Sequence, residues 1–586
     1  MNTQSYFAAA LLAATALTHA PAFAGTQAGL SLPALSRHDV TDLGAAPADT
    51  LIKMAITLRY RGQAGLDDLV RRQATPGAAE YHHFLTPAQF AARFAPAPAD
   101  YDRVLASLRA AGFTISREFA NHTVVDAVAG PQDVDRYFQT EIHAVNQAGH
   151  GLRYANLLPA QVPAEIAGTV SAVLGLDNVV KLKTLNHRAA HVPAGTEDTP
   201  ARTGAPIERI VNGAFAGIYP AGLEHAYKYP SLGSTTGTGH AIGIVIDSDI
   251  ASSGLSTFWK AAGITRTGTF NRVLVNGTNP GVNADSGETA IDTETTSSLA
   301  PGADIYVYLT SSLSDADIED AYNLAVSNAN LDVLSSSFGG CELADTPFAS
   351  ATDAIAEQGA AIGLTFTASS GDSGGFCEDQ TAAGAIFFSP DIVNSPASGP
   401  HFVAVGGTTL KINASTGGRT SETAWSPGGA SGGGGGGVSS YFALPSYQTG
   451  ITGVAVVPKV TLKKNDLKPN TGFAGRNVPD IALDASNATG SYIAVYDAGW
   501  TGYGGTSVSN PVFAALVALQ NQVNGSLSGY LNTSLYAAYT NHGAAPGGVY
   551  GTDFHDITSG KIGGGWSAKA GYDQATGIGT ILNGSF

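Results

Sequence analysis

Cysteine, methionine and charged residues are scarce in this chain of 586 residues. It contains two cysteines, Cys341 and Cys377, and only 13% of its residues are charged. Two cysteines this far apart exclude a Cys-x-x-Cys motif, a Cys/His zinc site and a disulfide-rich small scaffold. The low charge, with 44% hydrophobic residues and 72 glycines, argues against a disordered or coiled-coil chain and favours tightly packed domains. A single disulfide and two unreactive thiols both remain open at this point.

Basic residues are the minority among the charges. The chain has 30 Lys+Arg against 47 Asp+Glu, a net charge of −17, and most of the acidic excess lies beyond residue 186. This balance argues against a nucleic-acid partner. A carboxylate-rich surface repels itself least when it is partly protonated, so it suits acidic surroundings, although many neutral secreted proteins share it.

Long apolar runs are confined to the N-terminus. Residues 1–24 contain an apolar segment, 7–20, and end in Ala-Phe-Ala before Gly25, which predicts a signal peptide with its cleavage site. No Lys or Arg precedes the apolar segment, which departs from the usual pattern. No later stretch is apolar enough to cross a membrane. We therefore expect a secreted, extracellular protein with no membrane partner.

The pattern of apolar residues divides the rest of the chain, as its length requires. Residues 30–182 alternate strand-like and helix-like segments, which predicts an α+β domain. Residues 183–211 lack periodicity over most of their length and are predicted to form an exposed linker. Residues 212–586 contain short apolar strands with helices between them, which predicts an α/β domain with a mainly parallel sheet. The expected strands of this last domain are 241–246, 305–309, 333–336, 362–368, 401–405 and 492–496.

A glycine-rich turn presents Ser507 at the start of a predicted helix. The sequence Gly-Gly-Thr-Ser at 504–507 follows a strand and precedes an apolar helical segment, 511–523. The dipole and free N–H groups at a helix N-terminus stabilise a developing negative charge. Serine is also a common N-cap, so the tripeptide alone is a weak signal. The longer run Gly-Thr-Ser-x-x-x-Pro resembles the serine-bearing segment of the subtilisin clan and makes Ser507 a candidate nucleophile.

The histidine base of a subtilisin is missing from this sequence. No histidine beyond residue 205 lies in a His-Gly-Thr context, and Asp247, which imitates the subtilisin aspartate, lacks that partner, so we interpret it as structural. Glu288 and Asp292 offer another base, since they are four residues apart on one face of a predicted helix. Two close carboxylates share protons, so one can accept the serine proton while the other orients it. The alternative is a pair of solvated carboxylates on an exposed helix.

Asp372 lies in a glycine-flanked turn, Ser-Ser-Gly-Asp-Ser-Gly at 369–374, directly after an expected strand. Its carboxyl group could simply cap a backbone amide. The functional interpretation is a protonated carboxyl that donates to the oxyanion of a tetrahedral intermediate. A carboxylic acid donates only while it is neutral, so this role would tie activity to acidic pH.

These residues together resemble the sedolisin family of serine-carboxyl peptidases. Three motifs match in order and spacing, namely Gly-Glu…Asp at 287–292, Ser-Gly-Asp-Ser at 370–373 and Gly-Gly-Thr-Ser at 504–507. Further matches are 299–303, 475–480 and 555–558, with Tyr-His-His-Phe-Leu-Thr at 81–86 and Phe90 resembling the family's activation domain. The resemblance covers nearly the whole chain beyond the predicted signal peptide.

The resemblance implies a catalytic apparatus and a fold. Ser507 would be the nucleophile, Glu288 the general base, Asp292 its partner and Asp372 the oxyanion acid of a serine-type endopeptidase or tripeptidyl-peptidase. The α/β catalytic domain would be subtilisin-like, with a mainly parallel sheet. A ferredoxin-like α+β prosegment, 30–182, would precede it and inhibit it until acid autoprocessing cuts the linker. We expect a monomer that acts on protein or peptide substrates.

The resemblance also implies a structural calcium ion and favours the disulfide. Asp556 and Asp573 would supply carboxylates, and Ile557 and Gly571 main-chain carbonyls, which are the hard oxygen ligands that Ca²⁺ prefers. Lys569 stands where the family often has a glycine, and a main-chain ligand survives that change. The two cysteines each follow a matching motif, which supports their pairing.

Three other classes of protein fit the sequence less well. A histidine-dependent subtilisin lacks its histidine motif, the organisation of the chain excludes a two-aspartate acid peptidase, and a non-catalytic binding protein would not need all four catalytic-type residues. Substrate specificity stays open, because Phe338 and the glycine run 431–437 stand where the family shapes its substrate cleft. By itself the glycine run is interpreted as a flexible connector, the alternative being backbone that approaches a ligand closely.

Overall fold

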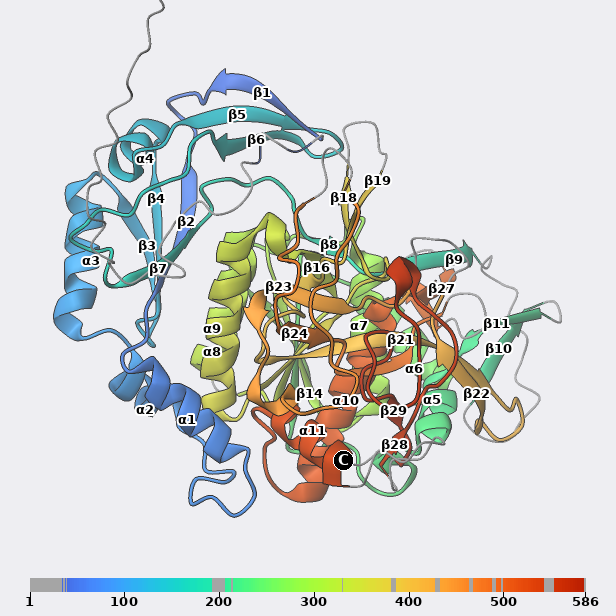
Figure 1. Ribbon diagram of the computed structural model, residues 1–586. Helices are drawn as coiled ribbons and strands as arrows, with labels where there is room; N and C mark the ends of the chain where they lie inside the picture. Colours follow the sequence, from blue (N-terminus) through green and yellow to red (C-terminus); the bar gives the residue numbers. More distant parts are fainter. Residues whose placement is uncertain are drawn as a thin grey trace, which may run out of the picture.

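Two domains lie against one another in the computed structural model (Figure 1). The structure describes residues 34, 37, 39–191, 206–211, 214–328, 330–380, 386–426, 433–462, 467–486, 492–496, 499–541 and 553–583. The predicted signal peptide and residues 192–205 of the predicted linker lie outside the described residues. None of the described helices is long and apolar enough to span a membrane.

The N-terminal domain, blue to cyan in Figure 1, is an α+β fold with ferredoxin-like topology. Its elements are β1 (Val40–Ala45), β2 (Ile52–Leu58), α1 (Gln63–Gln73), α2 (Pro87–Phe94), α3 (Pro98–Ala110), β3 (Thr114–Glu118), β4 (Val124–Ala129), α4 (Pro131–Phe138), β5 (Ile142–Gln147), β6 (Gly151–Asn156) and β7 (Val170–Leu174). The main sheet is antiparallel with the order β3-β4-β2-β7, and β1, β5 and β6 form a second sheet. This is the order of a βαββαβ unit with a hairpin added before its last strand, and it confirms the predicted prosegment fold.

Helices α2 and α4 begin where their first residues encode a helix start. The Thr86 side chain accepts from the Gln89 backbone amide, and the Gln89 side chain accepts from the Thr86 amide, which forms a capping box before α2. Proline begins both helices, at Pro87 and Pro131, where its missing N–H costs nothing. The local signals therefore determine where these two helices begin.

The C-terminal domain is built on an eight-stranded, mainly parallel sheet. Its elements are α5 (Pro220–Tyr227), β12 (Ala241–Ile246), α6 (Ser252–Ala262), β13 (Phe270–Leu274), α7 (Ser286–Leu299), β14 (Asp304–Leu309), α8 (Asp315–Asn328), β15 (Val333–Ser336), β16 (Phe338–Cys341), α9 (Thr346–Ile362), β17 (Thr365–Ser369), β18 (Phe376–Gln380), β19 (Ile386–Pro390), β20 (Asn394–Ser395), β21 (Phe402–Ile412), β22 (Arg419–Ala424), β23 (Gly437–Ala443), β24 (Gly475–Val478), β25 (Ile481–Asp484), β26 (Tyr492–Tyr496), β27 (Gly499–Gly504), α10 (Thr506–Asn524), α11 (Leu531–Asn541), β28 (Phe554–His555) and β29 (Thr580–Ile581). The order of the main sheet is β13-β14-β12-β15-β17-β21-β22, with β25 also paired to β21. Only the β21–β22 pair is antiparallel, so the predicted fold class is confirmed.

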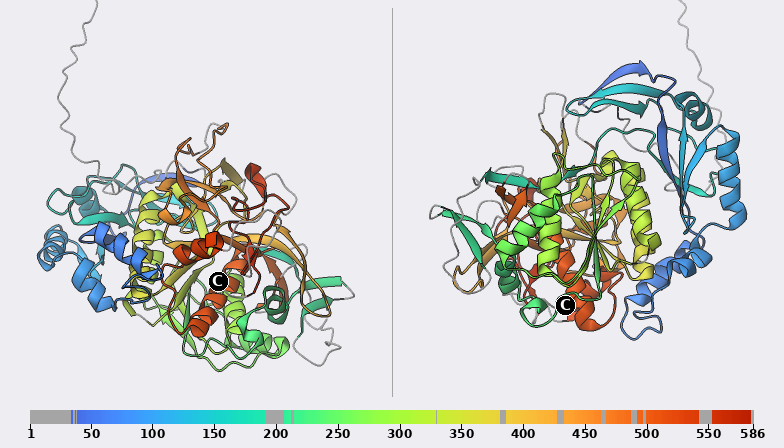
Figure 2. Two further views of the ribbon diagram at one scale, coloured as in Figure 1. Left: turned by 60° about the horizontal axis from the view of Figure 1, so that its bottom comes forward. Right: turned by 180° about the vertical axis from the view of Figure 1, so that it is seen from behind.

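Helices cover both faces of this sheet (Figure 2). Successive side chains of a strand point to opposite faces, and those of β12 divide accordingly between two hydrophobic cores. Ile244 packs in the core that contains Ile291 of α7 and Phe513 of α10. Val245 packs in the core that contains residues of α8 and α9. The sheet is thus buried on both sides, and α7 and α10 lie together on one of them.

The predicted strand 362–368 begins three residues too early. Helix α9 continues to Ile362 and ends at Gly363, whose φ of 94° is the left-handed conformation that commonly terminates helices. Strand β17 therefore starts at Thr365. The apolar run that suggested one strand contains the end of a helix and the start of a strand, which an apolar pattern cannot separate.

The prosegment packs against α8 and α9 and then feeds the chain into the second domain. Lys181 lies buried at this boundary, 3.0 Å from Asp177 of the prosegment and 2.7 Å from Asp315 of α8, and it also pairs with Asp345. Strand β8 (Lys183–Thr184) then pairs with β16, and β9 (His187–His191) pairs with β27. Strands β10 (Glu208–Val211) and β11 (Ala214–Ile218) join β26, β27 and β9 in a five-stranded sheet.

Candidate active site

Ser507 lies in the first turn of α10. Gly505, two residues earlier, occupies a position where no side chain would fit. Gly505 has φ 116° and precedes the helix. A Cβ at Gly505 would lie 2.3 Å from the Leu185 carbonyl oxygen and 2.7 Å from Oδ2 of Asp372. The glycine therefore allows three pieces of chain to meet beside the Ser507 hydroxyl. Ser507 itself is fully buried.

Glu288 and Asp292 lie on α7, the helix that packs against α10. Both side chains are fully buried, so the alternative of two solvated carboxylates does not describe them. Burial, reinforced by the charge of Asp292, raises the pKa of Glu288 well above its ordinary value. Burial also raises the pKa of Asp292 to about 8. The two interacting carboxyls therefore retain protons at pH values where isolated carboxylates are ionised.

Ser337 connects the serine to this carboxylate pair. The Ser507 hydroxyl donates to the Ser337 carbonyl oxygen at 3.0 Å, and the Ser337 hydroxyl donates to Oδ1 of Asp292 at 2.6 Å. Glu288 accepts from the Asn186 side-chain amide at 2.7 Å. Polar contacts with Asn186 and Ser507 oppose part of the effect of burial on the pKa of Glu288, which stays raised. One polar cluster thus joins the serine to both carboxylates.

Sequence reasoning missed Ser337 and Asn186. Ser337 lies between β15 and β16 and matches none of the motifs, although the small residues at 335–337, 339 and 340, at the end of a buried strand, are a weak signal of close backbone approach. Asn186 lies in the predicted linker, and nothing in its sequence surroundings indicates contact with Glu288. Both residues reach the site only through the fold.

Asp372 lies in the turn after β17. One of its carboxyl oxygens caps a backbone amide, as the simpler interpretation predicted, and the other oxygen is left to a different neighbour. Its Oδ1 accepts from the Thr506 backbone amide at 2.7 Å and from the Thr506 hydroxyl at 2.8 Å, so it does cap the start of α10. Its Oδ2 lies 3.2 Å from Nε2 of His187. Because Thr506 precedes Ser507, this capping interaction also holds Oδ2 beside the candidate nucleophile.

Histidine does not occupy the position of a base in the described part of the chain. None of the hydrogen bonds that the structure gives to Ser507 or Glu288 involves a histidine. His401 pairs with a carboxylate of α9, and His240 pairs with Asp332. The groups beside the serine hydroxyl are therefore carboxylates, amides and other hydroxyls.

The described part of the glycine run, 433–437, is packed against the turn that carries Asp372. The Gly435 amide donates to the Gly371 carbonyl oxygen at 2.5 Å. A Cβ at Gly435 would lie 2.2 Å from the Ser370 carbonyl oxygen. The interpretation as a flexible connector is therefore wrong for 433–437, where glycine is needed because two backbones touch.

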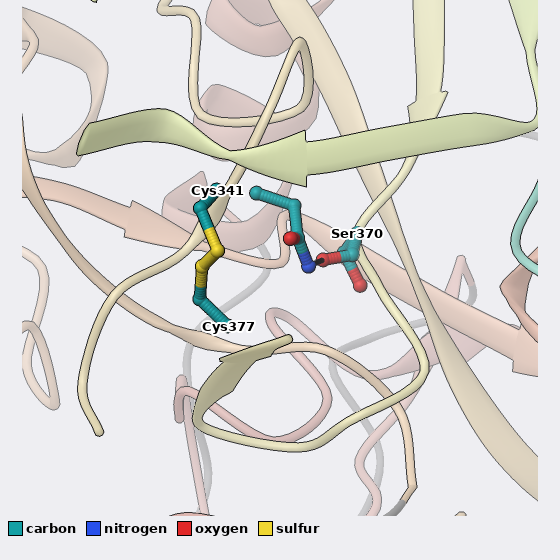
Figure 3. The surroundings of a disulfide bond; sticks show 4 residues. Cys341, Ser370 and Cys377 are labelled. Atoms are coloured by element: carbon teal, nitrogen blue, oxygen red, sulfur yellow. Dashed lines mark hydrogen bonds between the residues drawn. A yellow bond between two sulfur atoms is a disulfide. The ribbon is translucent and has the colours of Figure 1, made fainter. Parts of the chain in front are cut away.

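The disulfide between Cys341 and Cys377 is present, as the family resemblance predicted. The two Cα atoms are 5.3 Å apart. Figure 3 shows the disulfide beside Ser370, whose carbonyl oxygen accepts from the Asn394 side-chain amide at 3.3 Å. The bond ties the end of β16 to β18, which follows the turn that carries Asp372. It therefore holds two walls of the site together.

Two of the residues predicted to bind calcium, Asp556 and Asp573, are buried, and both carboxylates accept from backbone amides within residues 569–571. The Gly571 amide donates to Asp556 at 3.0 Å, and the Lys569 amide donates to Asp573 at 2.8 Å, while the Lys569 side chain is exposed. The described residues contain no group of three or more carboxylate, histidine or cysteine side chains that could hold a metal ion. Main-chain oxygens, such as that of Ile557, would have to complete a shell. Two carboxylates with neighbouring carbonyls fit the oxygen preference of Ca²⁺.

Comparison with known proteins decides the family. Residues 38–179 match the model of the pro-kumamolisin activation domain, and residues 277–554 match that of the subtilase family. Sedolisin from Pseudomonas sp. (strain 101) is 31% identical over 554 residues, which cover 90% of this chain and 85% of the relative. The chain belongs to the sedolisin family. The family predicted from the sequence is thus confirmed, and the protein is a serine-type peptidase with an activation prosegment.

Other members of the sedolisin family match over similar lengths. Kumamolisin from Bacillus sp. (strain MN-32) is 31% identical over 559 residues, which cover 92% of each chain. Xanthomonalisin from Xanthomonas sp. (strain T-22) is 28% identical over 596 residues, which cover 94% of this chain and 67% of the relative. A solved structure of Pseudomonas sedolisin, complexed with two molecules of pseudo-iodotyrostatin, superimposes with a TM-score of 0.52 at 28% identity and covers 62% of this chain and 95% of that one.

Proposed function

We propose that this sedolisin-family member is a secreted peptidase that hydrolyses peptide bonds in acid. Ser507 is the nucleophile, Glu288 its general base, Asp292 the partner of that base and Asp372 the oxyanion acid. The observation that carries the proposal is the buried cluster in which the Ser507 hydroxyl lies among carboxylates, with Asp372 bound to the neighbouring Thr506. Substrates are proteins or peptides, cut internally or by release of tripeptides.

The chemistry is acyl transfer through the serine. As Oγ of Ser507 attacks the carbonyl carbon of the substrate, its proton passes to Glu288. Asp372 and the Ser507 backbone amide donate to the oxyanion. The bond to the leaving amine then breaks, and Glu288 returns the proton to that amine. Water repeats the sequence on the acyl-enzyme and releases the acid product.

The roles of the carboxyl groups restrict the reaction to acid. Glu288 accepts a proton only if the pair that it forms with Asp292 is at least singly ionised. Asp372 donates only while it is protonated. Burial raises the pKa of both members of the pair, so the pair holds a shared proton, and Glu288 acts as the base when that proton lies on Asp292. The requirement on Asp372 places the reaction below neutral pH, where the pair can ionise only after the connecting segment, whose Asn186 lies on Glu288, has left the site.

The prosegment and a calcium ion complete the proposal. The chain is made as a zymogen whose prosegment, bound along α8 and α9, leads its C-terminal residues through the active site. Asp556 and Asp573, with the carbonyls of Ile557 and Gly571, would hold one Ca²⁺. When bound, the ion supplies positive charge that neutralises two buried carboxylates. The mature enzyme acts as an extracellular monomer.

The experiment that tests the proposal is hydrolysis of a denatured protein in acid. We expect wild-type protein to release peptides below neutral pH, and pepstatin to have little effect. Ser507→Ala should reduce the rate to background, and Thr540→Ala, a hydroxyl deletion in α11, should leave it unchanged. Full activity of Ser507→Ala would overturn the proposal.

A further inference from the structure

The chain leaving the prosegment continues as two strands, β8 and β9, on the catalytic domain (Figure 1). Strand β8 pairs antiparallel with β16, with Thr184 opposite Phe338. Two residues later, β9 pairs antiparallel with β27. Leu185 and Asn186 are the residues between these strands, so the peptide bond that joins them lies where the chain passes Ser507.

Three hydrogen bonds fix this peptide bond at the site. The Leu185 amide donates to the Ser337 carbonyl oxygen at 3.1 Å and so continues the pairing with β16. The Ser507 backbone amide donates to the Leu185 carbonyl oxygen at 2.9 Å. On the other side of the bond, the Asn186 side chain donates to Glu288 at 2.7 Å. The carbonyl is thus polarised by the nucleophile's own amide, and the next residue contacts the proposed base.

A second donor for the same carbonyl lies close by. A Cβ at Gly505 would lie 2.3 Å from the Leu185 carbonyl oxygen and 2.7 Å from Oδ2 of Asp372. The two oxygen atoms therefore lie on the same side of Gly505, where Oδ2 is also 3.2 Å from Nε2 of His187. The Leu185 carbonyl is placed as the carbonyl of a substrate, between Ser507 and Asp372.

We propose that Leu185–Asn186 is the bond that the zymogen cuts in itself, and that the pocket around Leu185 selects substrates with a branched aliphatic residue before the scissile bond. The inference rests on the proposed function. Oγ of Ser507 forms an ester with the Leu185 carbonyl carbon, the C–N bond to Asn186 breaks, and the new amine of Asn186 takes the proton that Glu288 received. Water then hydrolyses the ester, leaving a Leu185 carboxylate and a free Ser507 hydroxyl.

The side-chain specificity follows from the packing of Leu185. Its side chain is only 2% exposed, although it belongs to the connecting segment. A Cβ at Gly339 would lie 3.2 Å from Cδ1 of Leu185 and 3.2 Å from the Ser395 carbonyl oxygen. The pocket thus has the depth of a leucine because Gly339 has no side chain. An added methyl group there would contact the leucine and a rigid backbone oxygen at the same time.

Contacts on both sides of the Leu185–Asn186 bond hold the two chain ends that cleavage would create. Residues up to Leu185 belong to the prosegment side, where Lys181 is held by the buried ion cluster at the domain boundary. Residues from His187 onward are held by β27 of the catalytic domain. Cleavage between Leu185 and Asn186 therefore leaves the new N-terminus on β27 and the new C-terminus on the prosegment, which β8 and Lys181 still hold against the catalytic domain.

Mass spectrometry of early self-processing tests the cleavage site. Full-length protein is acidified, and the intact masses of both fragments are followed from the first minutes. We expect a prosegment fragment ending at Leu185 and a catalytic fragment beginning at Asn186. Leu185→Asp should slow cleavage of this bond about tenfold or more, whereas Leu152→Asp, at an exposed prosegment position, should not. A first cut at any other bond would overturn the assignment.

A synthetic peptide with the sequence of residues 181–191 keeps the test independent of the folding of these variants. Mature wild-type enzyme should cut it between Leu and Asn, and replacement of that Leu by Asp should abolish the cut. Gly339→Ala should lower the preference for Leu over Ala before the scissile bond about tenfold. An unchanged preference would refute the role of the pocket.

These outcomes are distinguishable from failure of the proposed function. An enzyme that digests denatured protein through Ser507 but neither cuts at Leu185 nor prefers aliphatic residues contradicts only the inference. A protein whose self-processing and hydrolysis both persist in Ser507→Ala contradicts the proposed function itself.

Discussion

Thr506 donates both its backbone amide and its hydroxyl to a single oxygen of Asp372, at 2.7 and 2.8 Å. The residue before the candidate nucleophile therefore determines the orientation of the candidate oxyanion acid. One carboxyl oxygen is committed to holding the turn against α10, and the other lies 3.2 Å from Nε2 of His187, on the same side of Gly505 as the Leu185 carbonyl oxygen. Because the two oxygens of Asp372 have different neighbours, we predict that a substitution can keep one oxygen and replace the other.

Asp372→Asn separates the structural oxygen from the proton donor. The asparagine oxygen can still accept from Thr506, while its NH₂ group takes the place of Oδ2 and donates at every pH. We expect this variant to keep measurable activity and to lose the steep fall of kcat/KM as the pH rises toward neutral. Asp372→Ala, which removes both oxygens, should lose about 10²–10³ in kcat. The measurement is a kcat/KM profile against pH, and an Asn variant with the wild-type profile would contradict a proton-donating Asp372.

Ser337 is a positioning residue that acts through Asp292. Ser337→Ala removes the 2.6 Å hydrogen bond to Asp292. That hydrogen bond lowers the pKa of Asp292, so its loss should raise this pKa further. We expect about a tenfold lower kcat with KM nearly unchanged, and a shift of the pH profile. Ser337→Thr should restore both quantities, because it returns the hydroxyl. A fall in stability without any change of the pH profile would argue that Ser337 only supports the fold.

A pair of carboxyl groups lies across the boundary between the prosegment and the catalytic domain. Asp126 of β4 and Asp320 of α8 are hydrogen-bonded to one another, with Arg117, Asp317 and Glu319 as the neighbouring charged groups. Burial raises the pKa of Asp126 from 3.8 to about 6. The folded zymogen therefore holds more protons than the unfolded chain between these values, and the stability due to Asp126 is lost as the pH rises through about 6.

Asp126→Asn tests the sign of this effect in the inactive Ser507→Ala zymogen. A neutral amide needs no proton, so we expect the variant to be more stable than its parent at pH 7, by on the order of 1 kcal/mol. The difference should vanish near pH 4. The measurement is thermal unfolding at both pH values, with Asp102→Asn as an exposed control in the prosegment. Greater destabilisation by Asp126→Asn at neutral than at acidic pH would show that the pair works in the opposite direction.

Calcium removal should lower stability before it affects catalysis, because the proposed ligands lie in a C-terminal loop region and not beside Ser507. We expect a chelator to lower the unfolding temperature of the wild-type protein and added Ca²⁺ to restore it. Elemental analysis should find one ion per chain. Asp556→Asn should abolish the response to the chelator, while Asp553→Asn, three residues earlier, should keep it. A wild-type protein that carries no metal and ignores the chelator would refute the site.

Local sequence signals were enough to select the candidate site residues that lie within short motifs of their own. Ser507, Glu288 and Asp372 each lie in a short pattern whose geometry depends on neighbouring residues, such as the glycine before Thr506. Ser337 and Asn186 could not be found in this way, because they reach the site only after β16 and the connecting segment have folded against α7. The domain order followed from apolar periodicity, whereas the start of β17 did not, because an apolar run does not distinguish the last turn of α9 from a strand. The glycine run was misinterpreted for a related reason, since close contact between two distant backbones leaves no local pattern.

The most direct test of a carboxylate base is Glu288→Gln, which keeps the size of the side chain and one oxygen that can accept from Asn186, and removes its ability to take a proton. Hydrolysis of a denatured protein by mature wild-type enzyme and by this variant is compared at the acidic optimum, after confirming that both unfold at the same temperature. If the variant cannot process itself, its prosegment is removed by added wild-type enzyme. We predict a loss of about 10²–10⁴ in kcat with little change in KM. A Glu288→Gln enzyme that keeps wild-type kcat would contradict the account.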